Sequence, residues 1–247
     1  MPPLPIGEPV RFRAPAPPSR VALYGRYVLL RPLEPDTDVD ALYAVSHPPE
    51  GDPSIWTYLF EGPYENVEQM RRELTEQAAS EDPLFFALIP LPRERPSGVV
   101  SYLRITPQFG VIEIGNVWLG TPIQRTTAAT EAIYLLARHA FDELGYRRLE
   151  WKCNALNAAS RSAAERLGFT FEGIFRKHMV VKGRNRDTAW YAIVDDDWPA
   201  VREGFERWLD PDNFDASSRQ RRRLSELIAP RAPHTVTPAS SSDASSA

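Results

Sequence analysis

The chain has 247 residues, 43% of them hydrophobic, which is enough for a packed globular core, and a formal net charge of -4. This charge gives no general attraction to nucleic acids or anionic membranes, and no apolar run is long enough for a membrane span or a secretory signal. The single cysteine, Cys153, excludes an internal disulfide, and the four histidines show no paired ligand spacing, so we expect a cytoplasmic protein without a metal site.

The first half of the chain is predicted to contain an arm, strands and two helices. Residues 1–20 are rich in proline, which fixes φ and withdraws backbone donors, so this arm is expected to be extended or disordered. Strong helix formers in residues 65–80 carry Val67, Met70 and Leu74 at helical spacing. In chain order we predict a strand over 25–32, a helix over 36–46, a loop over 54–64, a helix over 65–80, and antiparallel strands over 84–90, 98–105 and 110–119.

From Thr126 onward apolar residues recur at intervals of three or four, which predicts a helix that Gly145 ends. After it we predict a strand over 147–153, a helix over 157–167, strands over 169–175 and 187–194, and a last helix from about Asp197. Residues 211–247 pass from a basic cluster into a Ser/Ala-rich segment, and we expect this tail to be disordered. The fold class is therefore a mixed α/β domain over residues 21–210.

The segment that begins the long helix has the character of a phosphate site. It comprises Gln124, Arg125, Thr126, Thr127, Ala128, Ala129 and Thr130. Unpaired backbone N–H groups and the positive end of a helix dipole attract phosphate oxygens, and Arg125 and the threonine hydroxyls add donors. An ordinary threonine-capped helix is the alternative interpretation of this segment alone.

Three motifs in order resemble the GNAT superfamily of acyl-CoA N-acyltransferases, especially the branch of ribosomal-protein N-terminal (alanine) acetyltransferases. They are EIGNVWL at 113–119, QRTTAATEA at 124–132, and NAAS at 157–160 followed by Leu167-Gly168-Phe169. The resemblance covers about residues 25–209. It implies a central, mostly antiparallel sheet that is splayed at the coenzyme site and flanked by helices. It also implies acetyl-CoA as cosubstrate and no metal.

The resemblance further implies which residues contact the coenzyme. A backbone N–H near Val117 or Trp118 could polarise the thioester carbonyl. For the Trp118 side chain, core packing is the alternative to direct contact. The implied contacts are Val117, Trp118, Leu119, the segment 124–130, Asn157 and Ser160.

Two residues are candidates for catalysis. Glu113 is the candidate base, and a structural carboxylate on a strand is its alternative. Ser160 is placed by the resemblance to contact the leaving sulfur, and helix capping is its alternative. Cys153 is expected to be a buried structural thiol, because it lies in an apolar strand without a motif-matched histidine. Direct transfer in a ternary complex is therefore preferred to an acyl-enzyme.

The acceptor is expected to be a small-molecule amine or a peptide N-terminus, and a homodimer is left open. Trp56, Tyr58 and Phe60 lie where relatives build an acceptor wall, although they could equally be core. Residues 195–197 could attract a cationic acceptor or cap a helix. Thr127 stands where the family commonly has glycine, which keeps a weak or inactive acyl-CoA-binding module as an alternative function.

Overall fold

The computed structural model describes residues 4, 6–91 and 93–230, and residues 6–20 contain neither helix nor strand. Within this part of the chain eight strands form one sheet, in the order β1-β2-β3-β4-β5-β6-β8-β7. They are β1 (Leu23–Tyr24), β2 (Val28–Pro32), β3 (Leu84–Pro90), β4 (Gly98–Thr106), β5 (Val111–Leu119), β6 (Arg148–Asn154), β7 (Thr170–Val181) and β8 (Arg184–Val194). Only β5 and β6 pair in parallel, so the mostly antiparallel sheet is confirmed.

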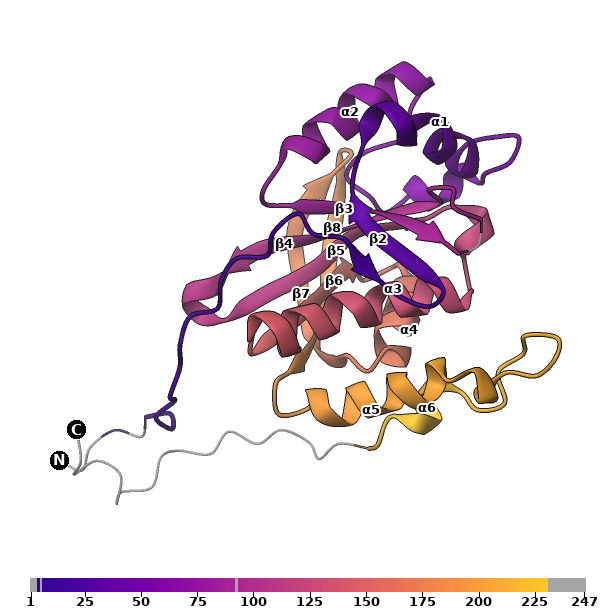
Figure 1. Cartoon of the computed structure of the whole chain (residues 1–247). Coiled ribbons are helices and arrows are strands. Elements are labelled where there is room, and N and C mark those ends of the chain that lie inside the picture. The colour runs from indigo at the N-terminus through magenta and orange to yellow at the C-terminus, as the bar shows by residue number, and fades with distance from the viewer. Residues whose placement is uncertain (1–3, 5, 92, 231–247) are drawn as a thin grey trace.

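Helices cover both faces of the sheet (Figure 1). Helices α1 (Pro35–Ser46) and α2 (Val67–Ala79) lie on one face. The other face carries α3 (Thr127–Arg138), α4 (Ala158–Arg166), α5 (Trp198–Leu209) and α6 (Leu224–Leu227). Each face encloses its own apolar cluster. None of the helices described is both long and apolar enough to cross a membrane.

Helix α3 forms where the apolar spacing predicts it. Thr126 is its N-cap, because the Thr126 Oγ1 accepts a hydrogen bond from Ala129 N at 3.3 Å. The helix continues as a π-helical turn over His139–Leu144 and ends at Gly145, whose φ of 82° is left-handed. Burial of Leu136 and its neighbours against the sheet supplies the main stabilisation, about 1.5–3 kcal/mol for each large apolar side chain.

Strand β5 contains a bulge that decides which way its later side chains point. The pairing advances three residues from Gly115 to Trp118 but only two along β4. Asn116 lies in this bulge with a left-handed φ of 50°. Because successive side chains alternate between the faces, one extra residue moves the later ones to the opposite face. Ile114 therefore packs toward α3, whereas Trp118 packs toward α1 and α2.

The prediction of a disordered tail over 211–247 is wrong for residues 211–230. The chain turns at Pro211–Asn213 and forms α6, which buries Leu224 and Leu227 against the α3 side of the core. The Asn213 amide nitrogen donates to Trp208 O at 3.0 Å and holds the turn. Two leucines among arginines and serines are too few to change the composition, so composition alone does not predict this packing. Residues 231–247 lie outside the described part of the chain.

Candidate active site

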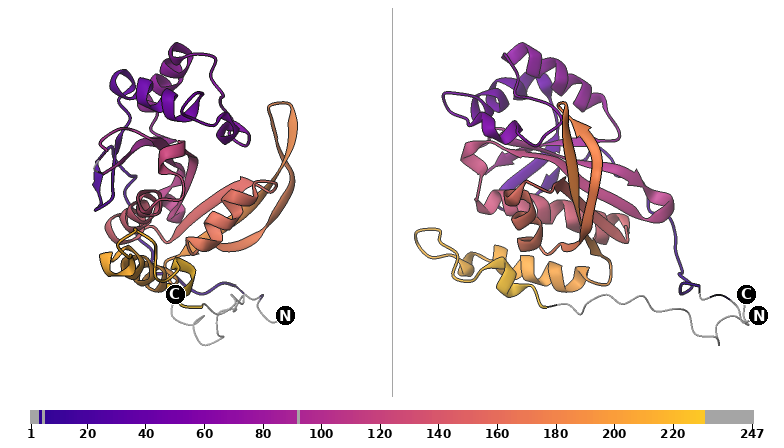
Figure 2. Two further views of the ribbon diagram at one scale, coloured as in Figure 1. Left: turned by 90° about the vertical axis from the view of Figure 1, so that its right-hand side faces the viewer. Right: turned by 180° about the vertical axis from the view of Figure 1, so that it is seen from behind.

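Strands β5 and β6 diverge after a short parallel pairing. Their register joins Val111–Ile114 to Arg148–Trp151 and goes no further. Beyond it lies a cleft lined by β5, β6, the first turn of α4 and the loop that precedes α2. In the left view of Figure 2, the β7–β8 hairpin likewise stands away from the N-terminal half of the sheet. The predicted splay is confirmed, and we call this space the splay cleft.

The bulge in β5 leaves backbone N–H and C=O groups facing the splay cleft without a partner on β4. Asn116 and Val117 fall between the paired positions of β4 and β5, and both line the cleft. A bulge leaves its extra residue outside the ladder of hydrogen bonds. Leu119, at the end of β5, is half-buried and packs against the core on the α3 side.

The N-terminus of α3 retains N–H groups for a ligand. Helix geometry leaves the first four N–H groups without a carbonyl partner inside the helix. Ala129 N donates to the Thr126 hydroxyl and Thr130 N to Thr126 O, and neither bond uses the N–H of Thr127 or Ala128. Gln124 Nε2 donates to Leu119 O at 2.9 Å, which ties the turn to the end of β5.

The side chains of residues 124–130 differ in their exposure to solvent. Arg125 and Gln124 are exposed, whereas Thr130 is buried and accepts a hydrogen bond from Arg166 at 3.0 Å. Thr127 is the first helical residue and has no left-handed φ; that conformation belongs to Arg125, with a φ of 58°. The backbone at Thr127 therefore does not require the glycine that the family commonly has there, because threonine adopts a helical conformation without strain.

Glu113 lies at the closed end of the splay cleft within a buried ionic network. Its carboxylate accepts from Arg104 Nη1 at 2.8 Å and from Lys152 Nζ at 2.7 Å. Lys152 also binds Glu150 at 2.6 Å and lies 3.9 Å from the Trp190 ring centroid. Burial opposes ionisation of Glu150, but hydrogen bonds from Lys152 and Arg148 lower its pKa. Both Glu113 oxygens therefore already accept hydrogen bonds from cations.

Asn157 and Ser160 lie at the opposite side of the cleft. The Asn157 Oδ1 accepts from Ser160 N at 3.0 Å, so Asn157 caps α4. Trp151 Nε1 donates to the Ser160 Oγ at 3.0 Å, which orients the hydroxyl. Burial raises the pKa of the neighbouring Cys153 thiol, against smaller opposing effects from Ser160 and nearby arginines. A thiol with a raised pKa is a poor nucleophile at neutral pH.

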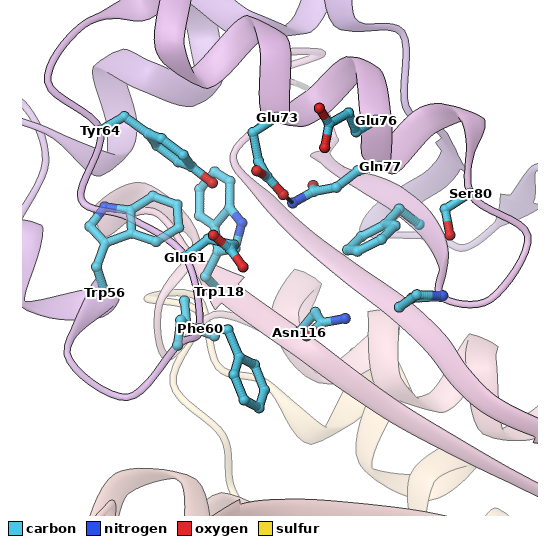
Figure 3. A pocket seen from close by; sticks show the side chains of 13 residues that line it. Trp56, Phe60, Glu61, Tyr64, Glu73, Glu76, Gln77, Ser80, Asn116 and Trp118 are labelled. Carbon is cyan, nitrogen blue, oxygen red and sulfur yellow. Dashed lines mark hydrogen bonds between the residues drawn. The ribbon is translucent and has the colours of Figure 1, made fainter. Parts of the chain in front are cut away.

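A second pocket, with a volume of about 320 Å³, lies on the α2 side of β5 (Figure 3). Trp56, Phe60, Tyr64 and Trp118 form its aromatic wall, and the Trp56 and Trp118 ring centroids are 5.0 Å apart. We call it the aromatic pocket. Of the predicted acceptor wall, Trp56 and Phe60 line this pocket, whereas Tyr58 lines the splay cleft, with its hydroxyl 3.3 Å from Leu156 O.

The tip of the β7–β8 hairpin forms hydrogen bonds with the loop that contains Trp56 and Phe60. Lys182 Nζ donates to Trp56 O and to Glu61 O, each at 3.0 Å. The sequence prediction ended these strands at 175 and 187, well short of the tip. The missed signal is the pair Lys182-Gly183, whose φ values of 48° and 71° make the hairpin turn.

Sequence reasoning also missed the acidic residues of the aromatic pocket. Glu61 comes from the loop, and Glu73 and Glu76 from α2. On a helix wheel the polar face of α2 looks the same whether it meets solvent or a pocket, so only the fold could distinguish them. Residues 195–197 line neither the aromatic pocket nor the splay cleft.

His47 forms a hydrogen bond with the backbone of Tyr64 in the aromatic wall, and this bond should make the stability of the protein depend on pH. Tyr64 N donates to His47 Nε2 at 3.0 Å, which requires that this nitrogen be unprotonated. Burial lowers the pKa of His47 from its usual 6.5, partly offset by Tyr43 O. The folded protein therefore binds this proton more weakly than the unfolded chain. The stabilising contribution is present above about pH 6.5 and is lost as the pH falls through the lower folded pKa.

We expect the free energy of unfolding of the wild type to fall more between pH 7.5 and 5.5 than that of His47→Gln, whose amide oxygen can accept from Tyr64 N without titrating. Urea unfolding at both pH values measures the difference. Equal losses in the two proteins would show that the pKa of His47 does not differ between the folded and the unfolded chain.

Comparison with known proteins places the chain among acetyltransferases. The family model "Acetyltransferase (GNAT) domain" matches residues 28–170. A GCN5-related N-acetyltransferase from Brucella melitensis is 44% identical, with a TM-score of 0.85, and the match covers 88% of this chain and 98% of that chain. The "Probable N-acetyltransferase YjcK" of Bacillus subtilis is 26% identical over 180 residues, 71% of this chain and 98% of that protein.

A Salmonella typhimurium acetyl transferase that modifies the N-terminal serine of 50S ribosomal subunit protein L7/L12 is 22% identical, with a TM-score of 0.59. That match covers 69% of this chain and 96% of that chain, and it shows a shared fold. The three sequence motifs, the diverging strands and the matched residues agree with one another. The chain belongs to the GNAT family of N-acetyltransferases.

Proposed function

We propose that this enzyme transfers the acetyl group of acetyl-CoA to a primary amine, on a small molecule or at a peptide N-terminus, by direct attack in a ternary complex. The observation that carries the proposal is that the splay cleft and the aromatic pocket lie next to each other at strand β5. The splay cleft and the aromatic pocket share Asn116 of β5, so a donor and an acceptor can approach the bulge from opposite sides.

The residues at the bulge suit an acyl transfer. The neutral amine nitrogen forms the C–N bond, the C–S bond breaks, the amine gives up a proton and coenzyme A leaves as the thiol. The Val117 N–H is the proposed donor to the carbonyl oxygen, where negative charge develops. The N–H groups of Thr127 and Ala128 are proposed to hold the pyrophosphate. A Cys153 thiol with a raised pKa supports direct attack over an acyl-enzyme.

Glu113 stays the candidate for receiving the amine proton. Because its oxygens accept from Arg104 and Lys152, an incoming amine or water would have to share an oxygen with one of these cations. The alternative is that Glu113 has a structural role, in which its carboxylate holds Lys152 in place. Rates of Glu113→Gln across pH 6 to 9 separate the two, because loss of a base changes the pH profile and loss of packing alone does not.

Release of free coenzyme A from acetyl-CoA, measured with a panel of amines and short peptides, tests the proposed function. A mass increase of the acceptor identifies the product. Initial rates at varied concentrations of both substrates should give intersecting lines, whereas parallel lines would indicate an acyl-enzyme. Binding of acetyl-CoA without turnover of any acceptor would instead favour the inactive binding module.

Replacing Ser160 with alanine is expected to lower kcat about tenfold or more and to change the KM for acetyl-CoA by less than about threefold. The reason is that the proposed hydroxyl contact is to the leaving sulfur, so its loss affects the transition state more than binding. Ser162→Ala, an exposed position of the same helix, is the matched control and should retain wild-type kinetics. An unchanged kcat in Ser160→Ala would leave Ser160 with a structural role alone.

A further inference from the structure

The aromatic pocket has a shape and position that suit the acceptor. Phe60 and Asn116 line both this pocket and the splay cleft, so the two spaces adjoin at these residues. Trp56 packs edge-on against Tyr64, with ring centroids 5.2 Å apart. A volume of about 320 Å³ is at the small end of the range for small-molecule sites. The pocket can therefore enclose a short aliphatic chain.

The rim of the pocket is negatively charged. Glu61, Glu73 and Glu76 line it, and in the described part of the chain none of the three forms an ion pair with a basic side chain. Lys182 lies near Glu61, but its ammonium group is bound to backbone carbonyls. Burial raises the pKa of Glu73, and the charges of Glu61 and Glu76 raise it further against a hydrogen bond from Gln77. A bound cation would relieve this repulsion.

Tyr64 points a polar atom into the pocket. Its side chain is 8% exposed, and its hydroxyl forms no hydrogen bond with any residue that the structure describes. Figure 3 shows the hydroxyl directed toward Glu73 and Gln77. The Oε1 atom of Gln77 is buried and also lacks a partner among these residues. A buried polar atom without a partner is uncommon in folded proteins, so the Gln77 Oε1 points to a polar group of a ligand, and the Tyr64 hydroxyl lines the same space.

We propose that the aromatic pocket binds an aliphatic amine that carries a second positive charge. One primary amine reaches past Asn116 to the splay cleft, and the second cationic group lies among Glu61, Glu73 and Glu76. The aromatic wall encloses the alkyl chain and attracts the cation through the faces of its rings. This inference rests on the proposed acetyl transfer and names the acceptor class for the same site. A peptide whose only basic group is its N-terminal amine has no second positive charge, so it would leave the carboxylates without a counterion.

The test compares 1,4-diaminobutane with 1-aminobutane as acceptors for the full-length enzyme and acetyl-CoA. In the wild type, kcat/KM is expected to be at least about tenfold higher for the diamine, because the carboxylates of Glu61, Glu73 and Glu76 surround its second ammonium group. The variant Glu73→Gln/Glu76→Gln is expected to reduce this ratio to about threefold or less. The control Glu68→Gln/Glu81→Gln removes the same charge from exposed positions outside the pocket and should keep the wild-type ratio.

Each outcome separates the inference from the proposed function. A wild-type ratio near one, an unchanged ratio in the pocket variant, or faster acetylation of a neutral tripeptide than of the diamine would overturn the diamine inference while leaving acetyl transfer intact. Absence of coenzyme A release with every acceptor would overturn the proposed function itself. Circular dichroism melting checks the fold, and Glu76→Gln alone, at an exposed position, replaces the double variant should that fail to fold.

Discussion

Replacing Glu131 with alanine is expected to lower the free energy of unfolding by about 3–6 kcal/mol. Glu131 lies on α3 and is 5% exposed. Its carboxylate accepts backbone N–H groups of Arg26 at 2.9 Å, Tyr27 at 2.6 Å and Val28 at 3.0 Å. One side chain thus satisfies three donors at the turn between β1 and β2. Alanine leaves them without an acceptor, and each buried donor left unpaired costs about 1–3 kcal/mol.

Guanidinium unfolding followed by circular dichroism measures the loss. Glu131→Gln keeps one acceptor oxygen and should lose about half as much. Glu203→Ala, an exposed residue of α5 in a surface ion pair, is the matched control and should stay within about 0.5 kcal/mol of the wild type. A loss below about 1 kcal/mol for Glu131→Ala would mean that water replaces the carboxylate at this turn.

The sequence predicted the parts of the fold in which local pattern and tertiary packing agree. The apolar spacing after Thr126 predicts α3 and its end at Gly145, and the helix predicted over 157–167 is α4. The prediction of an antiparallel meander over β3, β4 and β5 is confirmed by their register. In these segments one periodicity dominates over many residues, so neighbours cannot easily override it.

The parts that the sequence did not predict depend on single residues or on distant contacts. Asn116 reverses the faces of β5, but an asparagine within an apolar strand gives little sign of a bulge before the pairing is known. Trp118 consequently packs beside Trp56 in the aromatic pocket, on the side away from α3. The burial of α6 and the polar lining contributed by α2 likewise follow from which elements meet in space.

The proposed phosphate site at the N-terminus of α3 can be tested with a substitution that has opposite effects on the stability of the protein and on binding of the coenzyme. Thr127→Asp places a negative charge at the first position of the helix. A negative charge there stabilises the helix dipole by about 0.3–1 kcal/mol, so the unfolding free energy should stay the same or rise. A like charge within about 6 Å of a bound pyrophosphate costs on the order of 1–3 kcal/mol, so the KM for acetyl-CoA should rise about ten- to a hundredfold.

Initial rates and urea unfolding on the same preparation give both quantities. Thr127→Asn has a similar shape without the charge, and its KM should stay within about threefold of the wild type. A helix that is as stable as before but binds the coenzyme more weakly cannot be explained by local unfolding, because unfolding would lower both. An unchanged KM in Thr127→Asp would place the pyrophosphate away from this helix, and the Thr127 and Ala128 N–H groups would lose their proposed role.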